Sequence, residues 1–325
     1  MASHVLTSAR LDEVLRQASN SQATHHGGNS TVTRVRSGTT DYAVKDYSAR
    51  EDGLQRQLQE TAALILLNPG LNRYFAEPVG VAVDGLCAVH SWIDGIHPAT
   101  NDQTVASMLE ILSALHDLSK TTNQGRARPA TDQVIRPEQL RQQMEGRISR
   151  LVSGPPDVQR VTHERLIPAT KCLLTPGDGL RPPVLTLSPS DFGAHNLLWD
   201  EPTQSMHCVD LEFFGWDDAH KLVCDTLLHP LAQWTQDTAE GFLDGTASLY
   251  RLDMRRVAWL WPGLCLKWAA ISLARASRES TIGNAVAREQ AIKRAVNFIG
   301  QAESAAPDAA SMVEQIIVNR WEEHA

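Results

Sequence analysis

Two aspartates and an asparagine around a short apolar hairpin are the residues best suited to chemistry in this chain. Asn196 follows Asp191 after five residues, and Asp210 comes after the hairpin, whose predicted arms are residues 197–199 and 207–209. The hairpin would bring both aspartates to the same edge of a small sheet. One carboxylate could then face a reacting hydroxyl while the amide and the other carboxylate hold a divalent ion. Phosphoryl transfer needs such an arrangement, because its catalysis is mostly positioning and neutralisation of oxygen charge.

A lysine and a glutamate earlier in the chain could complete this site. Residues 41–47 alternate like a strand with Ala43 and Lys45 on one face, where the lysine could reach the phosphates of a nucleotide. Residues 51–67 have the pattern of a helix and carry Glu60 at the edge of the apolar face. A partly buried Glu60 would need a partner, and Lys45 is a candidate. A solvated lysine and a surface glutamate are the alternatives at this point.

A glycine-containing turn precedes the first long strand. Gly28, Asn29 and Ser30 lead into a β-branched segment at residues 31–36. Glycine adds no side chain, so the backbone N–H groups of such a turn can come close to phosphate oxygens. Taken alone, such residues more often form an ordinary hairpin turn.

The order of the predicted elements indicates an α+β chain with two lobes. A second hairpin, over residues 78–83 and 86–90, is followed by a connector, and nearly everything afterwards has a helical pattern. We therefore expect an N-terminal lobe over residues 1–90 and a C-terminal helical lobe over residues 91–325. Within the second lobe, residues 121–183 read as a largely helical insertion.

Composition narrows the class of protein. The 325 residues carry a net charge of −8, which argues against a nucleic-acid partner. Five scattered cysteines and a first segment without a signal-peptide pattern suggest a reducing, cytoplasmic setting. The apolar stretch 257–274 contains Pro262 and Lys267, so a buried helix that begins after Pro262 is preferred over a membrane span.

Two motifs resemble those of a known family. Residues 188–200 read SPSDFGAHNLLWD and residues 209–218 read VDLEFFGWDD. Together they are similar to the aminoglycoside phosphotransferase and choline kinase family, which has His-Gly-Asp-x4-Asn and then a strand-borne aspartate. The resemblance implies a protein-kinase-like fold with a small lobe of antiparallel sheet plus one helix and a larger, mostly helical lobe. Pro189-Ser190 in place of the family histidine, and His195, are departures from the pattern.

The resemblance also implies a role for each residue of the site. Asp191 would be the catalytic base or hydroxyl-orienting carboxylate, and Asn196 and Asp210 would bind Mg²⁺. Lys45 would contact the α- and β-phosphates of ATP while Glu60 holds it.

The nucleotide would lie between the glycine-containing turn and the connector at residues 90–93. The turn would cover the β- and γ-phosphates, and the connector would offer backbone groups to the adenine edge. The residues implied by the resemblance are Gly28, Asn29 and Ser30 for the turn, His90 and Trp92 for the connector, and Val32, Ala43, Leu198 and Val209 for the apolar walls.

The acceptor stays open within one chemical class. We expect a small hydroxylated metabolite, namely a sugar, amino sugar, aminoglycoside or amino alcohol, and no nucleic-acid or membrane partner. Four carboxylates are expected near the mouth of its pocket, those of Asp94, Glu212, Asp217 and Asp218, and Asp225 matches a family aspartate that braces the catalytic loop.

Two other functions compete with this one. The first is a catalytically idle nucleotide-binding scaffold, although such modules usually lose one of the five key residues that this chain retains. The second is a Ser/Thr protein kinase, which the absence of an Ala-Pro-Glu element after Asp210 disfavours.

Overall fold

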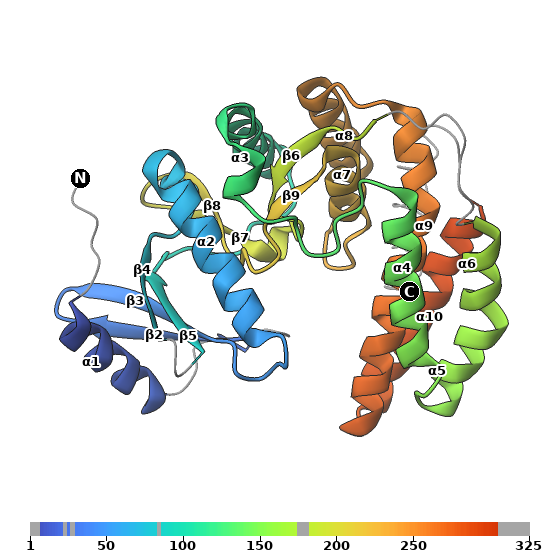
Figure 1. The fold of residues 1–325 in the computed structure, drawn as a ribbon, viewed down its shortest axis with the longest axis horizontal. Coiled ribbons are helices and arrows are strands. Elements are labelled where there is room, and N and C mark those ends of the chain that lie inside the picture. The colour runs from blue at the N-terminus through green and yellow to red at the C-terminus, as the bar shows by residue number, and fades with distance from the viewer. Residues whose placement is uncertain (1–6, 22–24, 27–29, 83–85, 174–181, 305–325) are drawn as a thin grey trace. The chain divides into compact units, whose positions relative to one another are not determined.

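The computed structural model describes residues 7–21, 25–26, 30–82, 86–173 and 182–304 (Figure 1). By their contacts, the residues form two compact units. The first contains Met1–Ala99, Glu110–Thr131 and Leu187–Trp216, and the second contains Thr100–Leu109, Asp132–Thr186 and Asp217–Ala325. After residue 99 the chain therefore re-enters the first unit twice. The lobes 1–90 and 91–325 divide the chain only once, and they remain a prediction.

The first unit is built on an antiparallel sheet of five strands. Its order is β1-β2-β3-β5-β4. The strands are β1 (His25–His26), β2 (Thr31–Ser37), β3 (Thr40–Asp46), β4 (Pro78–Ala82) and β5 (Cys87–Ser91). Strands β2 and β3 form a hairpin that turns at Gly38, whose φ of 64° lies in the region that glycine adopts without a steric cost. The expected hairpin of β4 and β5 is also present, and the turn between them lies outside the described residues.

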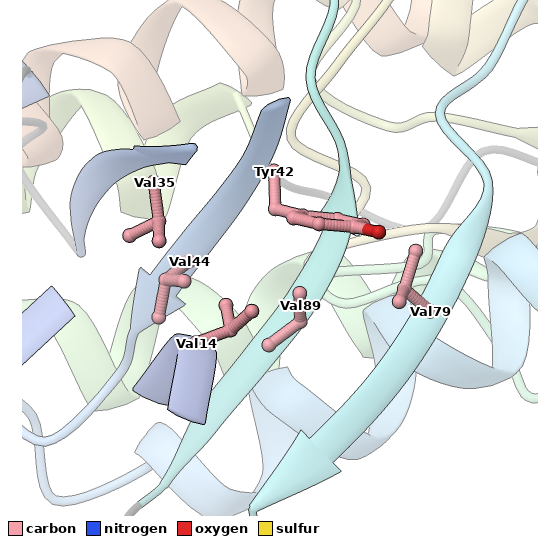
Figure 2. Close-up of a cluster of buried hydrophobic side chains, with 6 residues drawn as sticks. All are labelled: Val14, Val35, Tyr42, Val44, Val79 and Val89. Atoms are coloured by element: carbon pink, nitrogen blue, oxygen red, sulfur yellow. The ribbon is translucent and has the colours of Figure 1, made fainter. Parts of the chain in front are cut away.

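Helix α1 (Ser8–Ser19) packs on this sheet through Val14, which is fully buried. Because side chains alternate along a strand, each of the neighbouring strands contributes apolar residues to the same face. Figure 2 shows the cluster that results, in which the helix and four strands meet. Its members are Val14, Val35, Tyr42, Val44, Val79 and Val89. The opposite face of β3 is left for Ala43 and Lys45.

Helix α2 spans Gly53–Leu71 and buries Glu60, Leu64 and Leu67 on one side. The sequence predicts its end at Asn68, but the helix continues through Pro69. A proline removes the bond from its own nitrogen to the carbonyl four residues earlier. That residue is Ile65, which is 60% exposed, so water can satisfy the carbonyl and the helix tolerates the proline.

The predicted hairpin near the carboxyl end of the first unit is present. Strands β7 (Leu197–Asp200) and β8 (Ser205–Cys208) are antiparallel, with Leu197 opposite Cys208. The chain that leaves β5 is attached to this hairpin, because Ile96 and Trp199 exchange two backbone hydrogen bonds of 3.0 and 2.8 Å. The connector and the hairpin are therefore held side by side.

The second unit is mostly helical, and the prediction of an α+β chain is confirmed. Two four-residue strands, β6 (Leu185–Ser188) and β9 (Gly215–Asp218), pair with each other. These strands and helix α3 (Asp102–Thr121) each divide their residues between the units. The helices of the second unit are α4 (Pro137–Leu151), α5 (Pro156–Val161), α6 (Ile167–Leu173), α7 (Ala219–Leu228), α8 (Gln236–Tyr250), α9 (Met254–Thr281) and α10 (Ala285–Glu303).

Helix α9 differs from the prediction at its start. It begins at Met254 and runs through Pro262, whereas the sequence predicts a new helix after this proline. Among the described residues, α9 is the helix with the length and hydropathy that a membrane crossing would need, and 67% of its apolar window is buried within the protein. It contacts α4, α7 and α10, which is the environment of a core helix.

Candidate functional site

Lys45 is the centre of a buried charge cluster in the first unit. Its side chain leaves β3 on the face opposite the α1 cluster and is 6% exposed. The Nζ atom lies 2.6 Å from Glu60 Oε2 and 2.6 Å from Asp210 Oδ1. Burial disfavours the charged amine, but the carboxylates of Asp210 and Glu60 outweigh burial and raise the pKa of Lys45. The lysine is therefore held as a cation.

Glu60 receives three hydrogen bonds from this part of the chain. Lys45 Nζ and the Tyr47 hydroxyl each donate to Oε2 at 2.6 Å, and the Leu211 backbone N–H donates to Oε1 at 3.2 Å. Burial would raise the pKa of Glu60, but Lys45 and these hydrogen bonds lower it. The partnership expected for Lys45 and Glu60 is present.

Asp210 follows β8 and has an unusual backbone conformation. Its φ is 61°, which few residues other than glycine adopt, although asparagine and aspartate do so more readily than most. Burial and the negative charge of Glu60 raise the pKa of Asp210, in spite of the nearby Lys45. Such a strained backbone and a disfavoured charge are typical of a functional site rather than of a group kept for stability.

The loop that carries Asp191 and Asn196 is fixed by its own hydrogen bonds. Asn196 Nδ2 donates to the backbone carbonyl of Asp191 at 3.1 Å, and Val209 N donates to the carbonyl of Asn196 at 2.9 Å. His195 Nε2 lies 3.4 Å from Asp191 Oδ1. Loop and hairpin are thus joined, and the carboxylate of Asp191 is 29% exposed.

Pro189-Ser190, the departure from the family motif, is stabilised in another way. Ser190 has a φ of 67°, and its N–H donates to the Ser188 hydroxyl at 2.9 Å. The Ser190 hydroxyl donates to the Thr131 carbonyl at 3.3 Å. These bonds tie Ser190 to Ser188 and to Thr131.

A cavity of about 340 Å³ lies within the first unit. This volume is within the usual range for sites of small ligands. Ten residues with a predicted contact to nucleotide or metal line it, together with Val209. They are Ser30, Val32, Ala43, Lys45, Glu60, His90, Trp92, Leu198, Asn196 and Asp210. Asp191 is not among the residues that line it, and Gly28 and Asn29 lie outside the described residues.

The four carboxylates expected at the mouth of an acceptor pocket do not form one group. Asp94 is exposed, with 79% of its side chain accessible. Glu212, Asp217 and Asp218 are fully buried. Within the second unit, Asp217 pairs with Lys221 and Asp218 pairs with Arg256, so these two carboxylates belong to the core. The expectation that Glu212, Asp217 and Asp218 lie at the mouth of a pocket is wrong.

Glu212 instead belongs to the Lys45 cluster, which sequence reasoning missed. Its Oε2 lies 3.8 Å from Lys45 Nζ, and its Oε1 accepts a hydrogen bond from Arg56 Nη1. Burial and the charge of Asp210 raise the pKa of Glu212 to about 7. Two signals could have indicated this residue. Glu212 is two residues from Asp210, and Arg56 is four residues from Glu60, so that Arg56 lies on the same helix face as Glu60 and could pair with a further carboxylate there.

Comparison with known proteins identifies the family. Residues 22–260, more than half of the chain, match the sequence model of the phosphotransferase enzyme family. Curated protein sequences gave no significant match.

Solved structures of this type share the fold at low sequence identity. The macrolide 2′-phosphotransferase of Brachybacterium faecium has a TM-score of 0.57 and 16% identity, with coverage of 89% of this chain and 98% of that one. The choline kinase of Streptococcus pneumoniae has a TM-score of 0.60 and 13% identity, with coverage of 89% and 98%. A spectinomycin phosphotransferase in complex with ADP and spectinomycin has a TM-score of 0.56 and 13% identity, with coverage of 96% and 98%.

These likenesses confirm the protein-kinase-like fold. Taken with the family match and the lysine–glutamate–aspartate cluster beside the cavity, they give one conclusion. The chain belongs to the phosphotransferase enzyme family.

Proposed function

We propose that this protein is an ATP-dependent kinase that transfers the γ-phosphate to a hydroxyl group of a small metabolite. The observation that carries the proposal is Lys45, held 2.6 Å from both Glu60 and Asp210 in the wall of a cavity of nucleotide size. Family membership supports the reaction class. The complex of the spectinomycin phosphotransferase with ADP supports a nucleotide in the equivalent cavity.

In this proposal, the chain supplies the fixed charges that phosphates need. Lys45 contacts the α- and β-phosphates, and Glu60 keeps the amine oriented. Ser30 lines the same cavity and continues from the turn that we propose covers the β- and γ-phosphates. Val32, Ala43 and Leu198 provide the apolar surface against which a flat base can pack.

Asn196 and Asp210 fit a magnesium ion by the chemistry of their donors. An amide oxygen and a carboxylate are oxygen ligands of the kind that Mg²⁺ prefers. Three carboxylates, those of Glu60, Asp210 and Glu212, face the two cations Lys45 and Arg56, and the remaining negative charge favours a further cation. When bound, the ion neutralises charge on the β- and γ-phosphate oxygens.

Asp191 is the proposed base. The acceptor oxygen attacks the γ-phosphorus, the bond from that phosphorus to the bridging oxygen of ADP breaks, and the hydroxyl proton passes to the Asp191 carboxylate. The exposed fraction of 29% leaves this carboxylate open to an acceptor, and the hydrogen bond from Asn196 to its backbone fixes the loop.

The acceptor class is a sugar, amino sugar, aminoglycoside or amino alcohol. The solved structures of similar fold include enzymes named for macrolide, choline and spectinomycin, which are all small hydroxylated molecules. In this proposal the C-terminal lobe, 91–325, with its helical insertion 121–183, supplies the acceptor pocket, and the reaction takes place in the cytoplasm.

A screen for ADP formation over these acceptor classes tests the function, with Asp191→Asn as the decisive variant. The variant is expected to bind ATP as the wild type does and to lose transfer by about 10³-fold, since general-base catalysis contributes up to about 10⁴-fold. Asp200→Asn, which changes a carboxylate on the same hairpin outside the cavity lining, is the matched control and should retain activity.

Three results distinguish the alternatives. Transfer by Asp191→Asn at the wild-type rate would refute the role of this residue. Binding of ATP without turnover for any acceptor would favour the idle scaffold. Phosphate transfer from labelled ATP to protein but to none of the small acceptors would favour the Ser/Thr protein kinase.

A further inference from the structure

Among the described residues, His90 carries a buried polar atom without a hydrogen-bond partner, on a side chain that lines the cavity. The residue lies on β5 opposite Ala43 and is 6% exposed. Its side chain lines the cavity together with Lys45 and Glu60. Within the described part of the chain, its Nε2 atom has no hydrogen-bond partner.

Such an atom requires an explanation. A buried donor or acceptor that is left unsatisfied is unfavourable and is rare in native proteins. Burial lowers the pKa of His90 in spite of the nearby Glu60. The ring is therefore neutral and can present a lone pair at Nε2 to a donor in the cavity.

The strand register indicates which part of a nucleotide would meet this ring. Lys45 is opposite Ala88, and Ala43, two residues away on the same face of β3, is opposite His90. At about 3.3 Å per residue, His90 lies roughly 7 Å along the sheet from the lysine proposed to hold the phosphates. His90 is the first residue of the connector at residues 90–93, where we propose that the adenine ring binds.

A purine base in this position would have its polar edge towards the connector. Its faces would pack between Val32, Ala43 and Leu198, which line the cavity, so its hydrogen-bonding groups would need partners in the plane of the ring. The 6-amino group of adenine has two N–H donors. A backbone carbonyl of the connector can accept from one, and an acceptor is then needed for the other.

We propose that His90 Nε2 accepts a hydrogen bond from the 6-amino group of the bound adenine base. The histidine is thereby a specificity-determining residue for the nucleotide, acting through its side chain. This inference rests on the proposed function, because it needs a nucleotide in the cavity.

The test compares ATP with purine riboside 5′-triphosphate, which lacks the 6-amino group, by calorimetric titration of the full chain. For a neutral hydrogen bond of ordinary strength, the wild type should bind ATP about 5- to 10-fold more tightly. In His90→Leu the preference for ATP should fall several-fold, to the level that the backbone carbonyl alone supplies, because one of the two partners of the amino group is gone. His90→Gln, which restores an acceptor, should recover part of the preference.

His207→Leu is the matched control. His207 is a partly buried histidine on β8 of the same unit and does not line the cavity, so the preference for ATP should be that of the wild type. If His90→Leu does not fold, His90→Phe, which keeps a planar ring and removes both nitrogens, takes its place.

An equal preference in the wild type and in the Leu or Phe variant would overturn the inference, since the buried nitrogen would then serve another group. A wild type that binds both nucleotides equally would overturn it as well. In both cases the nucleotide still binds and the proposed function stands. If neither nucleotide binds the wild type, the proposed function fails together with the inference.

Discussion

The two carboxylates that hold Lys45 are expected to respond in opposite ways to neutralisation. Glu60 and Asp210 are each 2.6 Å from the same amine. The environment lowers the pKa of Glu60, where Lys45 and hydrogen bonds outweigh burial, and raises the pKa of Asp210, where burial dominates. The folded protein thus favours the charge on Glu60 and disfavours the charge on Asp210. Glu60→Gln should destabilise the chain, and Asp210→Asn should not.

The cost of Glu60→Gln follows from the contacts that it breaks. The glutamate accepts hydrogen bonds from Lys45, Tyr47 and Leu211 with its two oxygens. In glutamine one of these oxygens becomes an N–H₂ group, which cannot accept a hydrogen bond. In place of Oε2 it would face the donors of Lys45 and Tyr47, and in place of Oε1 it would face the Leu211 N–H. Breaking a buried ion pair typically costs about 3–5 kcal/mol, and Asp210 still pairs with the lysine, so a loss of about 2–4 kcal/mol is expected.

Asp210→Asn removes a charge that the fold disfavours. Lys45 keeps Glu60 as its partner, and asparagine adopts a φ near 61° as readily as aspartate does. The free energy of unfolding should therefore change by no more than about 1 kcal/mol in either direction. In the proposed mechanism, however, phosphate transfer is lost with the carboxylate.

Urea unfolding without nucleotide, followed by circular dichroism at neutral pH, measures both variants against the wild type. The midpoint of Glu60→Gln should fall clearly while that of Asp210→Asn stays close to the wild-type value, with similar slopes. An Asp210→Asn variant that is destabilised as much as Glu60→Gln would refute the reasoning, because the pair would then contribute equally to stability.

Two further predictions concern other parts of the chain. Burial alone would raise the pKa of Asp225, but Lys267 and Lys221 outweigh it and lower the pKa to about 2. Because the pKa in the folded protein lies below that in the unfolded chain, the charged Asp225 stabilises the fold above about pH 4. This stabilisation is lost as the pH falls towards 2. In urea titrations, Asp225→Asn should be less stable by about 3–5 kcal/mol at neutral pH, and its deficit should shrink over that acidic range; a deficit that does not change with pH would contradict this account. A Cβ on Gly95 would lie 2.9 Å from the Trp199 carbonyl oxygen, so Gly95→Ala should cost about 1–3 kcal/mol and weaken ATP binding, whereas Gly146→Ala, which meets no atom within 4 Å, should leave ATP binding unchanged.

The parts of the site that could be predicted are those with a local pattern. Alternation along residues 41–47 places Lys45 on a particular face of its strand, and the helical period does the same for Glu60. The hairpin between Asn196 and Asp210 follows from a turn between two apolar segments. Each of these inferences needs only a few neighbouring residues, and the contacts among them follow from the family resemblance.

The parts that could not be predicted depend on contacts between distant segments. Spacing could have drawn attention to Glu212, but its burial beside Arg56 depends on packing against a helix much earlier in the chain. Pro262 marks the end of a helix by local rules, yet α9 continues because its neighbours α4, α7 and α10 hold it in place. The unpaired nitrogen of His90 is likewise a property of the packed cavity and not of its strand.

The ion pair between Lys45 and Asp210 also bears on how the protein exchanges nucleotide. Because Lys45 already pairs with Glu60 and Asp210, the charge of its buried amine is compensated when no ligand is bound. In the proposed mechanism, an arriving nucleotide and its metal ion must displace one of these partners before they gain their own contacts. The affinity for nucleotide is then a difference between two sets of interactions, and it is weaker than the contacts in the bound state alone would give.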